Sequence, residues 1–220
     1  MTASAGELIA AAPREVAVPA GALRVVHVVN ELQLAGLERV IAELVEGQRL
    51  AGIDSSALVV HEAGQLGERL HRSGYPITVL NAPYVRPWQR VPELVAWLRA
   101  GRHDVVHMHG GNWWSYGKSI RSATRAPFVY TLHGEQYPPS MKIHAVEFMG
   151  AVRTDHLVLV SEDLRQYSRK WWLDRWCPTD VVQNGILKLD LDFVRPARRP
   201  GPLRILHVAR LDSVKRQDVT

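Results

Sequence analysis

The chain has 220 residues, of which 46% are hydrophobic and 22% charged, a composition typical of a folded globular protein and not of a disordered or fibrous one. Its single cysteine, Cys177, excludes an internal disulfide and a cysteine-based zinc cage. The formal net charge of +5 comes entirely from residues 195–220, with seven basic and two acidic residues, since residues 1–194 hold 20 of each sign. A nucleic-acid binder would spread basic residues over a folded face, so no such function is indicated.

The first twenty residues are rich in alanine and contain two prolines, which predicts a disordered tail over residues 1–20. Glu7 and Glu15 interrupt the segment, and its apolar run is too short for a secretory signal. No stretch of the chain reaches the roughly 18 apolar residues that a membrane span requires.

After this tail, short runs of apolar and β-branched residues alternate with segments of helical periodicity. The strands are predicted at residues 23–29, 55–61, 76–80, 104–109, 127–133, 155–160, 180–184 and 203–209. The helices are predicted at residues 36–51, 64–73, 91–100, 113–123, 139–150 and 161–172. Because most strand runs are almost continuously apolar, helices are expected on both faces of the sheet. The alternation predicts an α/β fold with a Rossmann-like, doubly wound parallel sheet.

A proline- and arginine-rich segment, residues 195–202, separates the last two predicted strands and is interpreted as an interdomain hinge. It divides an N-terminal domain at 21–194 from residues 203–220, which read as a strand, a basic loop and the first residues of a helix. This order is typical of the beginning of a second αβ domain, which the sequence predicts to be truncated.

Two turns that follow predicted strands contain glycine. Gly36 opens the helix after the first strand, where free backbone amides can bind a phosphate, although a simple loop-to-helix turn explains the same residues. Asn184 and Gly185 follow the strand that precedes the hinge, and they fit either a turn or a wall of a cleft between domains.

Histidines gather at the predicted carboxyl ends of neighbouring strands. His107 and His109 are two residues apart and should share one face of their strand, and His133 ends the next strand. These three could form a zinc site with Glu135 as a base, or they could hydrogen-bond a substrate. His27 and His207 lie inside apolar strands and are interpreted as satisfied core histidines, whereas the sequence leaves the role of His61 open.

Two further features involve basic residues: a pair that follows a predicted strand, and two clusters with tryptophan. Arg210 and Lys215 follow the strand at 203–209 and could neutralise a diphosphate leaving group, or could belong to a solvated basic loop. Tryptophans adjoin basic residues at 113–114 and 169–176, a pattern found both in half-buried packing residues and in surfaces that contact sugars or membranes.

Seven loose motifs occur in the order and spacing of a known family. They are the strand ending at Asn30, then AGLERVIAEL, HDVVHMHG, APFVYTLHGE, the helix start SED, VVQNGI and VARLDSVKRQD. From residue 23 to 220 the chain thus resembles the N-terminal domain, and the start of the C-terminal domain, of retaining glycosyltransferases of the family-4 type with the GT-B fold.

The resemblance implies transfer of a sugar from a nucleotide-diphosphate sugar to a hydroxyl acceptor, with retention and without a metal or other cofactor. It implies that His133 lies near the transferred sugar, that Gly36, Arg210 and Lys215 hold the donor diphosphate, and that Glu38, His109, Asn184 and Gly185 line the acceptor side or the cleft. The sequence departs from the family pattern at Ala35 and Arg216, where glycine is common, and it ends before the carboxylate pair of the second domain.

The implied partners are a nucleotide sugar and a glycan or lipid-linked acceptor, with no nucleic acid. A cytoplasmic location follows, with peripheral contact at the inner face of the membrane as an option for lipid-linked acceptors. Two alternatives stay open at this stage: a non-catalytic domain that binds an acceptor or a partner, and a histidine-dependent metallohydrolase.

Overall fold

The computed structural model describes residues 19–135, 140–185 and 206–208 of the chain. The chain divides into two compact units, residues 1–187 and residues 188–220. The second unit is described only at residues 206–208, which are exposed and belong to neither a helix nor a strand. Residues 1–18, the predicted hinge at 195–202 and most of the strand predicted at 203–209 lie outside the described residues. The predicted domain boundaries therefore stay predictions.

Seven parallel strands form the sheet of the first unit, in the order β3-β2-β1-β4-β5-β6-β7. They are β1 (Arg24–Val29), β2 (Asp54–Val59), β3 (Ile77–Val79), β4 (Val105–His109), β5 (Phe128–Leu132), β6 (His156–Leu159) and β7 (Thr179–Val181). The chain lays down β1, β2 and β3 in one direction and then returns to place β4 beside β1. The direction of strand placement thus reverses between β1 and β4. Open α/β sheets bind their ligands outside the carboxyl ends of the strands at such a switch point.

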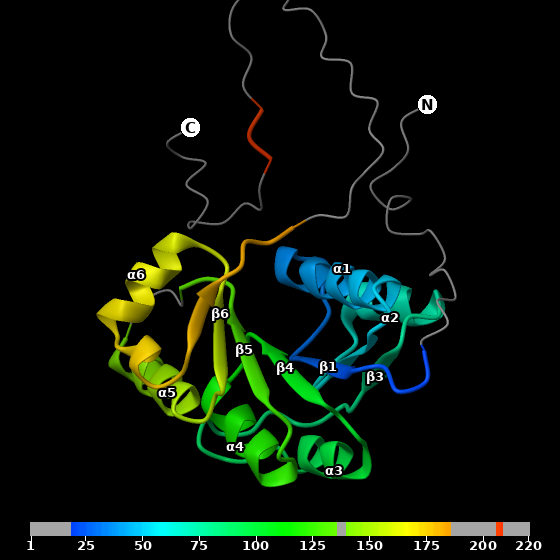
Figure 1. Ribbon diagram of the computed structural model, residues 1–220, viewed down its shortest axis with the longest axis horizontal. Coiled ribbons are helices and arrows are strands. Elements are labelled where there is room, and N and C mark those ends of the chain that lie inside the picture. The colour runs from blue at the N-terminus through cyan, green and yellow to red at the C-terminus, as the bar shows by residue number, and fades with distance from the viewer. Residues whose placement is uncertain (1–18, 136–139, 186–205, 209–220) are drawn as a thin grey trace, which may run out of the picture. The chain divides into compact units, whose positions relative to one another are not determined.

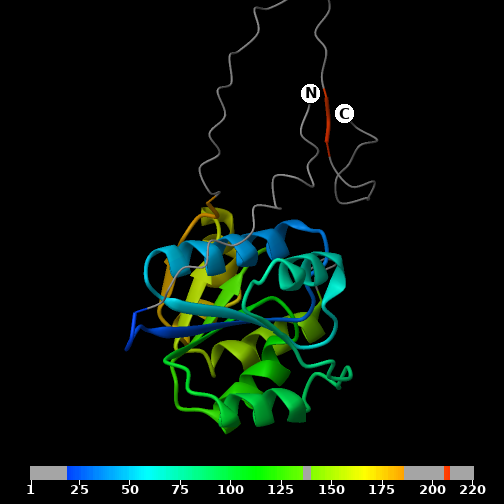
Figure 2. The same ribbon diagram turned by 90° about the vertical axis from the view of Figure 1, so that its right-hand side faces the viewer.

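Six helices connect these strands: α1 (Gly36–Leu50), α2 (Gly64–Arg72), α3 (Pro92–Ala100), α4 (Trp113–Ala123), α5 (Met141–Ala151) and α6 (Glu162–Lys170). Figures 1 and 2 show α1 and α2 on one face of the sheet and α3, α4 and α5 on the other. The predicted α/β class, the parallel sheet and the helices on both faces are confirmed. None of the helices that the structure describes is long and apolar enough to span a bilayer.

The helix starts follow the local signals in the sequence. Pro92 occupies the first turn of α3, and the Ser161 hydroxyl accepts a hydrogen bond from the backbone nitrogen of Leu164 at the start of α6. Most predicted ends differ from the observed ones by one to three residues, and two of these differences have a clear structural consequence. The helix predicted to reach residue 172 stops at Lys170, because Trp172 adopts a left-handed φ of 58° and introduces the short 3-10 helix η1 (Leu173–Arg175). The strand predicted at 180–184 ends at Val181, which leaves Asn184 in the loop beyond it.

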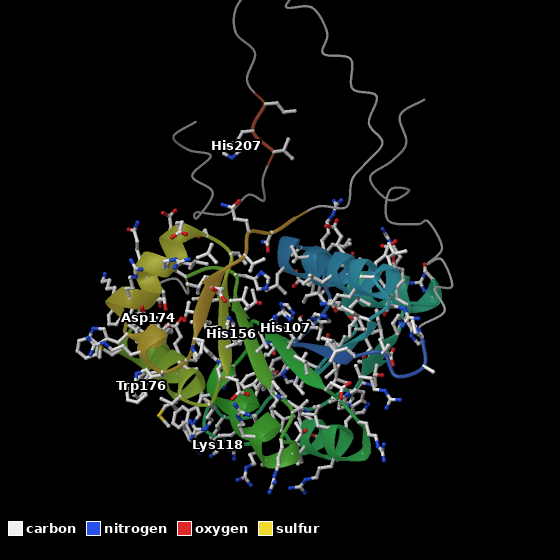
Figure 3. All side chains as sticks on the ribbon, in the orientation of Figure 1. His107, Lys118, His156, Asp174, Trp176 and His207 are labelled. Carbon is white, nitrogen blue, oxygen red and sulfur yellow. The ribbon has the colours of Figure 1, made fainter. Side chains whose placement is uncertain are left out.

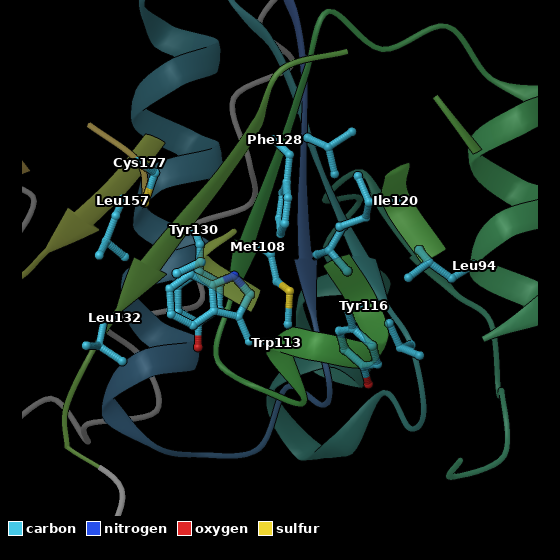
Figure 4. Close-up of a cluster of buried hydrophobic side chains, with 14 of the residues drawn as sticks. Leu94, Met108, Trp113, Tyr116, Ile120, Phe128, Tyr130, Leu132, Leu157 and Cys177 are labelled. Atoms are coloured by element: carbon cyan, nitrogen blue, oxygen red, sulfur yellow. The ribbon is translucent and has the colours of Figure 1, made fainter. Parts of the chain in front are cut away.

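Two hydrophobic clusters hold the layers together, one on each face of the sheet. The larger lies under α3 to α6 and includes Trp113, which is 1% exposed and stacks on Tyr130 with a centroid separation of 3.9 Å (Figure 4). The indole nitrogen of Trp113 also donates to Thr154 Oγ1 at 2.9 Å. Trp113 is thus a packing residue, one of the two roles predicted for it. The smaller cluster joins α1 and α2 to β1 and β2, around Ile41 and Val45.

Candidate functional site

A cavity of about 390 Å³ lies on the α1 side of the sheet. One wall is α1 and the residues that follow it; the other is formed by β4, β5 and β6 and by the segment after β7. It is lined by Val40, Glu43, Leu44, Gly47, Gln48, Ala51, Ile53, His107, His109, Thr131, His133, Val158, Val160, Val182, Gln183, Asn184 and Gly185. Apolar side chains dominate this lining, and its polar groups come from α1, from β4 and β5 with the residue after β5, and from the segment after β7.

Four of the predicted site residues line this cavity: His109, His133, Asn184 and Gly185. The parallel arrangement explains why, because the carboxyl ends of β4, β5 and β7 reach the same edge of the sheet. His107 and His109 are two residues apart on β4, so their side chains share one face of the strand, and both line the cavity as this spacing predicted. Figure 3 shows the side chain of His107 between the sheet and α1.

The histidines of the cavity wall continue inward as a line of hydrogen-bonded rings. His133 Nε2 lies 3.0 Å from His109 Nδ1, and His109 Nε2 lies 2.9 Å from His27 Nδ1. His27 Nε2 in turn lies 2.8 Å from Oε1 of Gln48 on α1. His107 stands beside this line and bonds Thr131 Oγ1 through its own Nε2 at 2.7 Å. The line thus links α1, through the middle of β1, to the carboxyl ends of β4 and β5.

Burial keeps these imidazoles neutral near neutral pH. It lowers the pKa of His27 and that of His133 from 6.5 to about 4. The pKa values of His107 and His109 are held well below the ordinary value, first by burial and then by the neighbouring histidines, whose positive charges would repel each other. A neutral imidazole has one donor and one acceptor nitrogen, so each ring can serve in a directed hydrogen-bond line.

His27 and Gln48 are the members of this group that the sequence did not reveal as site residues. His27 was interpreted as a satisfied core histidine, and it is fully buried with both ring nitrogens bonded, but both of its partners, His109 and Gln48, line the cavity. The sheet register places His27 directly opposite His107. His27 could therefore have been predicted only from the strand order that pairs β1 with β4. Gln48 joins the site because α1 lies over this part of the sheet and brings its side chain to His27.

A metal site was one reading of the histidines, built from His107, His109 and His133 with Glu135. The structure brings together a different set, because nitrogens of His27, His107 and His109 lie within 4.8 Å of one another. A metal ion bound to that set would take the lone pairs that now serve the hydrogen bond between His27 and His109. Glu135 is exposed, and the cavity lining does not include it.

Gly36 and Glu38 lie at the other end of α1 and do not line the cavity. Gly36 is exposed, with no atom near the position that a Cβ would take, and no side chain caps the helix at Ala35. The backbone amides of this first turn are the kind of group that binds phosphates. Gly36 precedes the cavity residue Val40 by about one helical turn, or roughly 6 Å of helix rise.

The loop after β4 needs its two glycines. Gly110 and Gly111 have φ values of +65° and +76°, which residues with a Cβ rarely adopt. A Cβ on Gly111 would also overlap the side-chain oxygen of Asn30, which accepts a hydrogen bond from the Tyr116 hydroxyl. This close packing fixes the loop between the end of β1 and α4.

His61, whose role the sequence left open, is a structural residue of this neighbourhood. It is buried, and its ring nitrogens bond the Ala82 carbonyl at 2.7 Å and the Tyr116 hydroxyl at 2.9 Å. Arg210 and Lys215, the predicted diphosphate ligands, lie outside the described residues, and their assignment stays a prediction.

Comparison with known proteins relates the chain to glycosyltransferases. The family model described as Glycosyltransferase Family 4 matches residues 34–187. Among solved structures, the chain is similar to a glycosyltransferase from Rickettsia africae ESF-5, with 17% identity and a TM-score of 0.57 over 76% of this chain and 44% of that one. It is also similar to Anabaena HepE, crystallised in complex with UDP and glucose, with 19% identity and a TM-score of 0.52 over 74% and 45% of the two chains. None of the curated proteins gives a significant match.

At these identities the two solved structures establish the fold, and the first unit matches a Rossmann-like half domain of the GT-B type, as predicted. The chain spans less than half the length of either structure. The family match covers all of α1 and the strand ends that line the cavity.

Proposed function

This chain belongs to glycosyltransferase family 4, and from that premise we propose that it serves in sugar transfer from a nucleotide-diphosphate sugar to a hydroxyl acceptor. The proposal includes retention of configuration at the anomeric carbon. One observation carries it: the family match at residues 34–187 includes every residue that lines the cavity, and one of these is His133, which the proposal places near the transferred sugar. The complex of the neighbour HepE with UDP and glucose supports a donor of the same class.

The proposal gives each predicted residue a role. His133 faces the transferred sugar, while Gly36, Arg210 and Lys215 hold the diphosphate. Glu38, His109, Asn184 and Gly185 form the acceptor side or the cleft wall. A neutral His133 suits contact with sugar hydroxyls, because an uncharged imidazole bonds a hydroxyl without the desolvation cost of a buried cation.

We propose further that the reaction needs no metal. Negative charge develops on the diphosphate as the bond to the sugar breaks, and two fixed cations, Arg210 and Lys215, can stabilise that charge where it forms. The histidine cluster supports this reading, because His27 and His109 already use both ring nitrogens in hydrogen bonds within the protein.

The acceptor is proposed to be a glycan or a lipid-linked hydroxyl compound, with the protein in the cytoplasm and peripheral at the membrane. Exposed aromatic and basic side chains near η1 support membrane contact. Trp172 and Trp176 are 62% and 53% exposed, and the Arg175 guanidinium lies 5.4 Å from the Trp172 ring centre. Tryptophan beside cations is the combination favoured at the interface of anionic bilayers.

Vesicle binding tests the membrane proposal. Trp172→Ala with Trp176→Ala should weaken binding to vesicles of mixed anionic and zwitterionic phospholipid, and high salt should weaken binding of the parent protein. Trp88→Ala is the matched control, because Trp88 is 51% exposed and lies outside this cluster. Equal binding by the double variant and the control would contradict membrane contact through η1.

Turnover tests the central proposal. The 220-residue chain is assayed for nucleotide release from UDP-glucose and a panel of other nucleotide sugars, with the anomeric configuration of the product read by NMR. His133→Ala should lower turnover about tenfold or more, the effect of losing one hydrogen bond to the reacting sugar. His71→Ala is the control, because His71 is exposed on α2.

Two outcomes would overturn the proposal. Turnover that is unchanged in His133→Ala would remove this residue from the sugar site. Binding of nucleotide sugar or acceptor without turnover of any tested donor would instead favour the alternative, a non-catalytic binding domain.

A further inference from the structure

Gln48 ends a line of three imidazoles that leads to the proposed sugar site. Its position on α1 is fixed, because its backbone oxygen accepts hydrogen bonds from the amides of Ala51 and Ile53 at 3.1 and 2.9 Å. Its side-chain oxygen faces His27 Nε2 at 2.8 Å. From there the contacts run through His109 to His133, and each joins one ring nitrogen to one ring nitrogen.

When every ring in this line is neutral, only two placements of the ring protons keep all the hydrogen bonds. A neutral imidazole donates from one nitrogen and accepts at the other, so the direction of the first hydrogen bond sets the direction of all the others. Burial favours the neutral form of all three rings, since it lowers the pKa of each. The two arrangements therefore differ at every ring, and one end of the line decides between them.

The structure turns the oxygen of the Gln48 carboxamide toward His27, and because an amide oxygen can only accept, this orientation places a proton on Nε2 of His27. His27 Nδ1 then accepts from His109 Nε2, and His109 Nδ1 accepts from His133 Nε2. This leaves Nδ1 of His133 without a proton. The same atom is buried and has no hydrogen-bond partner among the described residues.

We propose that Gln48 is a positioning residue that fixes the tautomer of His133 through His27 and His109, so that His133 presents Nδ1 as an acceptor. The proposal deepens the proposed function: the group that meets this nitrogen is a hydrogen-bond donor, such as a sugar hydroxyl, and not a phosphate oxygen. A buried acceptor without a partner destabilises the protein, and a bound hydroxyl that donates to it would remove that cost.

The line fixes a proton arrangement and does not conduct protons. A proton taken up at His133 could pass inward only as far as His27, because the amide oxygen of Gln48 does not bind a proton at physiological pH. His27 is fully buried, and burial disfavours its charged form. His107 lies outside the line, since its Nε2 bonds Thr131. The line thus ends at Gln48, which binds no proton, and at His133, which is the member proposed to meet the sugar.

Ring nitrogen NMR on the ligand-free 220-residue chain tests the proposal directly. With histidine labelled by nitrogen-15, long-range proton–nitrogen correlations tell which ring nitrogen carries the proton. The parent protein should show His27, His109 and His133 all protonated on Nε2. Gln48→Glu keeps an acceptor and should preserve this pattern, whereas Gln48→Lys can only donate and should move the His133 proton to Nδ1. Gln48→Met, which offers neither, should give a mixture of both tautomers.

His156 is an internal control, because its Nε2 faces Asp180 at 2.9 Å and its tautomer should not respond to changes at Gln48. Thermal unfolding of each variant checks its fold, and the comparison of Gln48→Glu with Gln48→Met suffices if the lysine variant does not fold. A parent protein with His133 protonated on Nδ1, or a His133 tautomer that is the same in all folded variants, would overturn the proposal. Because no substrate is present, the result does not depend on whether the chain transfers sugar.

Discussion

Acid should destabilise this protein through the buried histidines at a pH where most carboxylates are still ionised. His27 has its pKa lowered from 6.5 to about 4 by burial. Between these two values the unfolded chain binds a proton at this residue and the folded chain does not. The free energy of unfolding therefore falls as the pH falls through this range, and the stabilising contribution is fully present only above the unfolded pKa.

The size of the effect follows from the two pKa values. Between about pH 7.5 and about pH 5, His27 alone should lower the free energy of unfolding by roughly 2 kcal/mol. The same sign applies to His107, His109 and His133, whose pKa values are also lowered. Against a typical total stability of about 5–15 kcal/mol, the loss from His27 alone is a substantial fraction, and the other three histidines add to it with the same sign.

His27→Gln isolates the effect. Glutamine offers a donor and an acceptor to the same two neighbours but does not titrate, so the variant should be less stable at about pH 7.5 and yet lose roughly 2 kcal/mol less on acidification to about pH 5. Urea unfolding followed by tryptophan fluorescence at several pH values measures both quantities. His71→Gln, on the exposed end of α2, is the control and should follow the parent protein. If His27→Gln loses as much stability on acidification as the parent, the reasoning about His27 is refuted.

Two further predictions concern packing and metal. Gly150→Ala should lower the free energy of unfolding by about 2 kcal/mol, because a Cβ there would overlap the buried ring of Trp113. Gly47→Ala should instead raise the free energy of unfolding by up to about 1 kcal/mol, because its Cβ would meet open space and alanine favours a helix more than glycine does. Urea unfolding measures both, and a stabilised Gly150→Ala would contradict the packing. Dialysis against EDTA should leave nucleotide-sugar turnover unchanged, and a loss of turnover that Mg²⁺ or Mn²⁺ restores would overturn the metal-free proposal.

Local sequence signals were enough to predict the elements of the first unit. Most strand runs, such as residues 155–160, are largely apolar because helices cover the sheet on both sides, and this pattern can be recognised without knowing which strands lie next to each other. The prediction failed where one residue departs from its local pattern. Trp172 sits in a segment with helical periodicity, but its left-handed conformation ends α6 two residues early.

The site was predicted only to the extent that it follows from strand ends. His109, His133, Asn184 and Gly185 come from different strands, yet parallel pairing brings their ends to one edge regardless of strand order. His27 is different, because it lies in the middle of β1 and reaches His109 only through the return of the chain that places β4 beside β1. No local pattern encodes that adjacency.

The role of Gln48 depends on one more level of structure. A glutamine on an amphipathic helix is ordinarily a solvated or partly covered residue, and nothing in its neighbours marks it. Its importance arises because neutral imidazoles cannot choose a proton arrangement by themselves, and the only group in the line with a fixed hydrogen-bonding sense at that contact is the oxygen that faces His27. A residue in the last turn of α1 can thereby determine what His133 offers a ligand without contacting His133 itself. We expect such determinants wherever buried histidines form a chain, and they are found by following donors and acceptors from ring to ring.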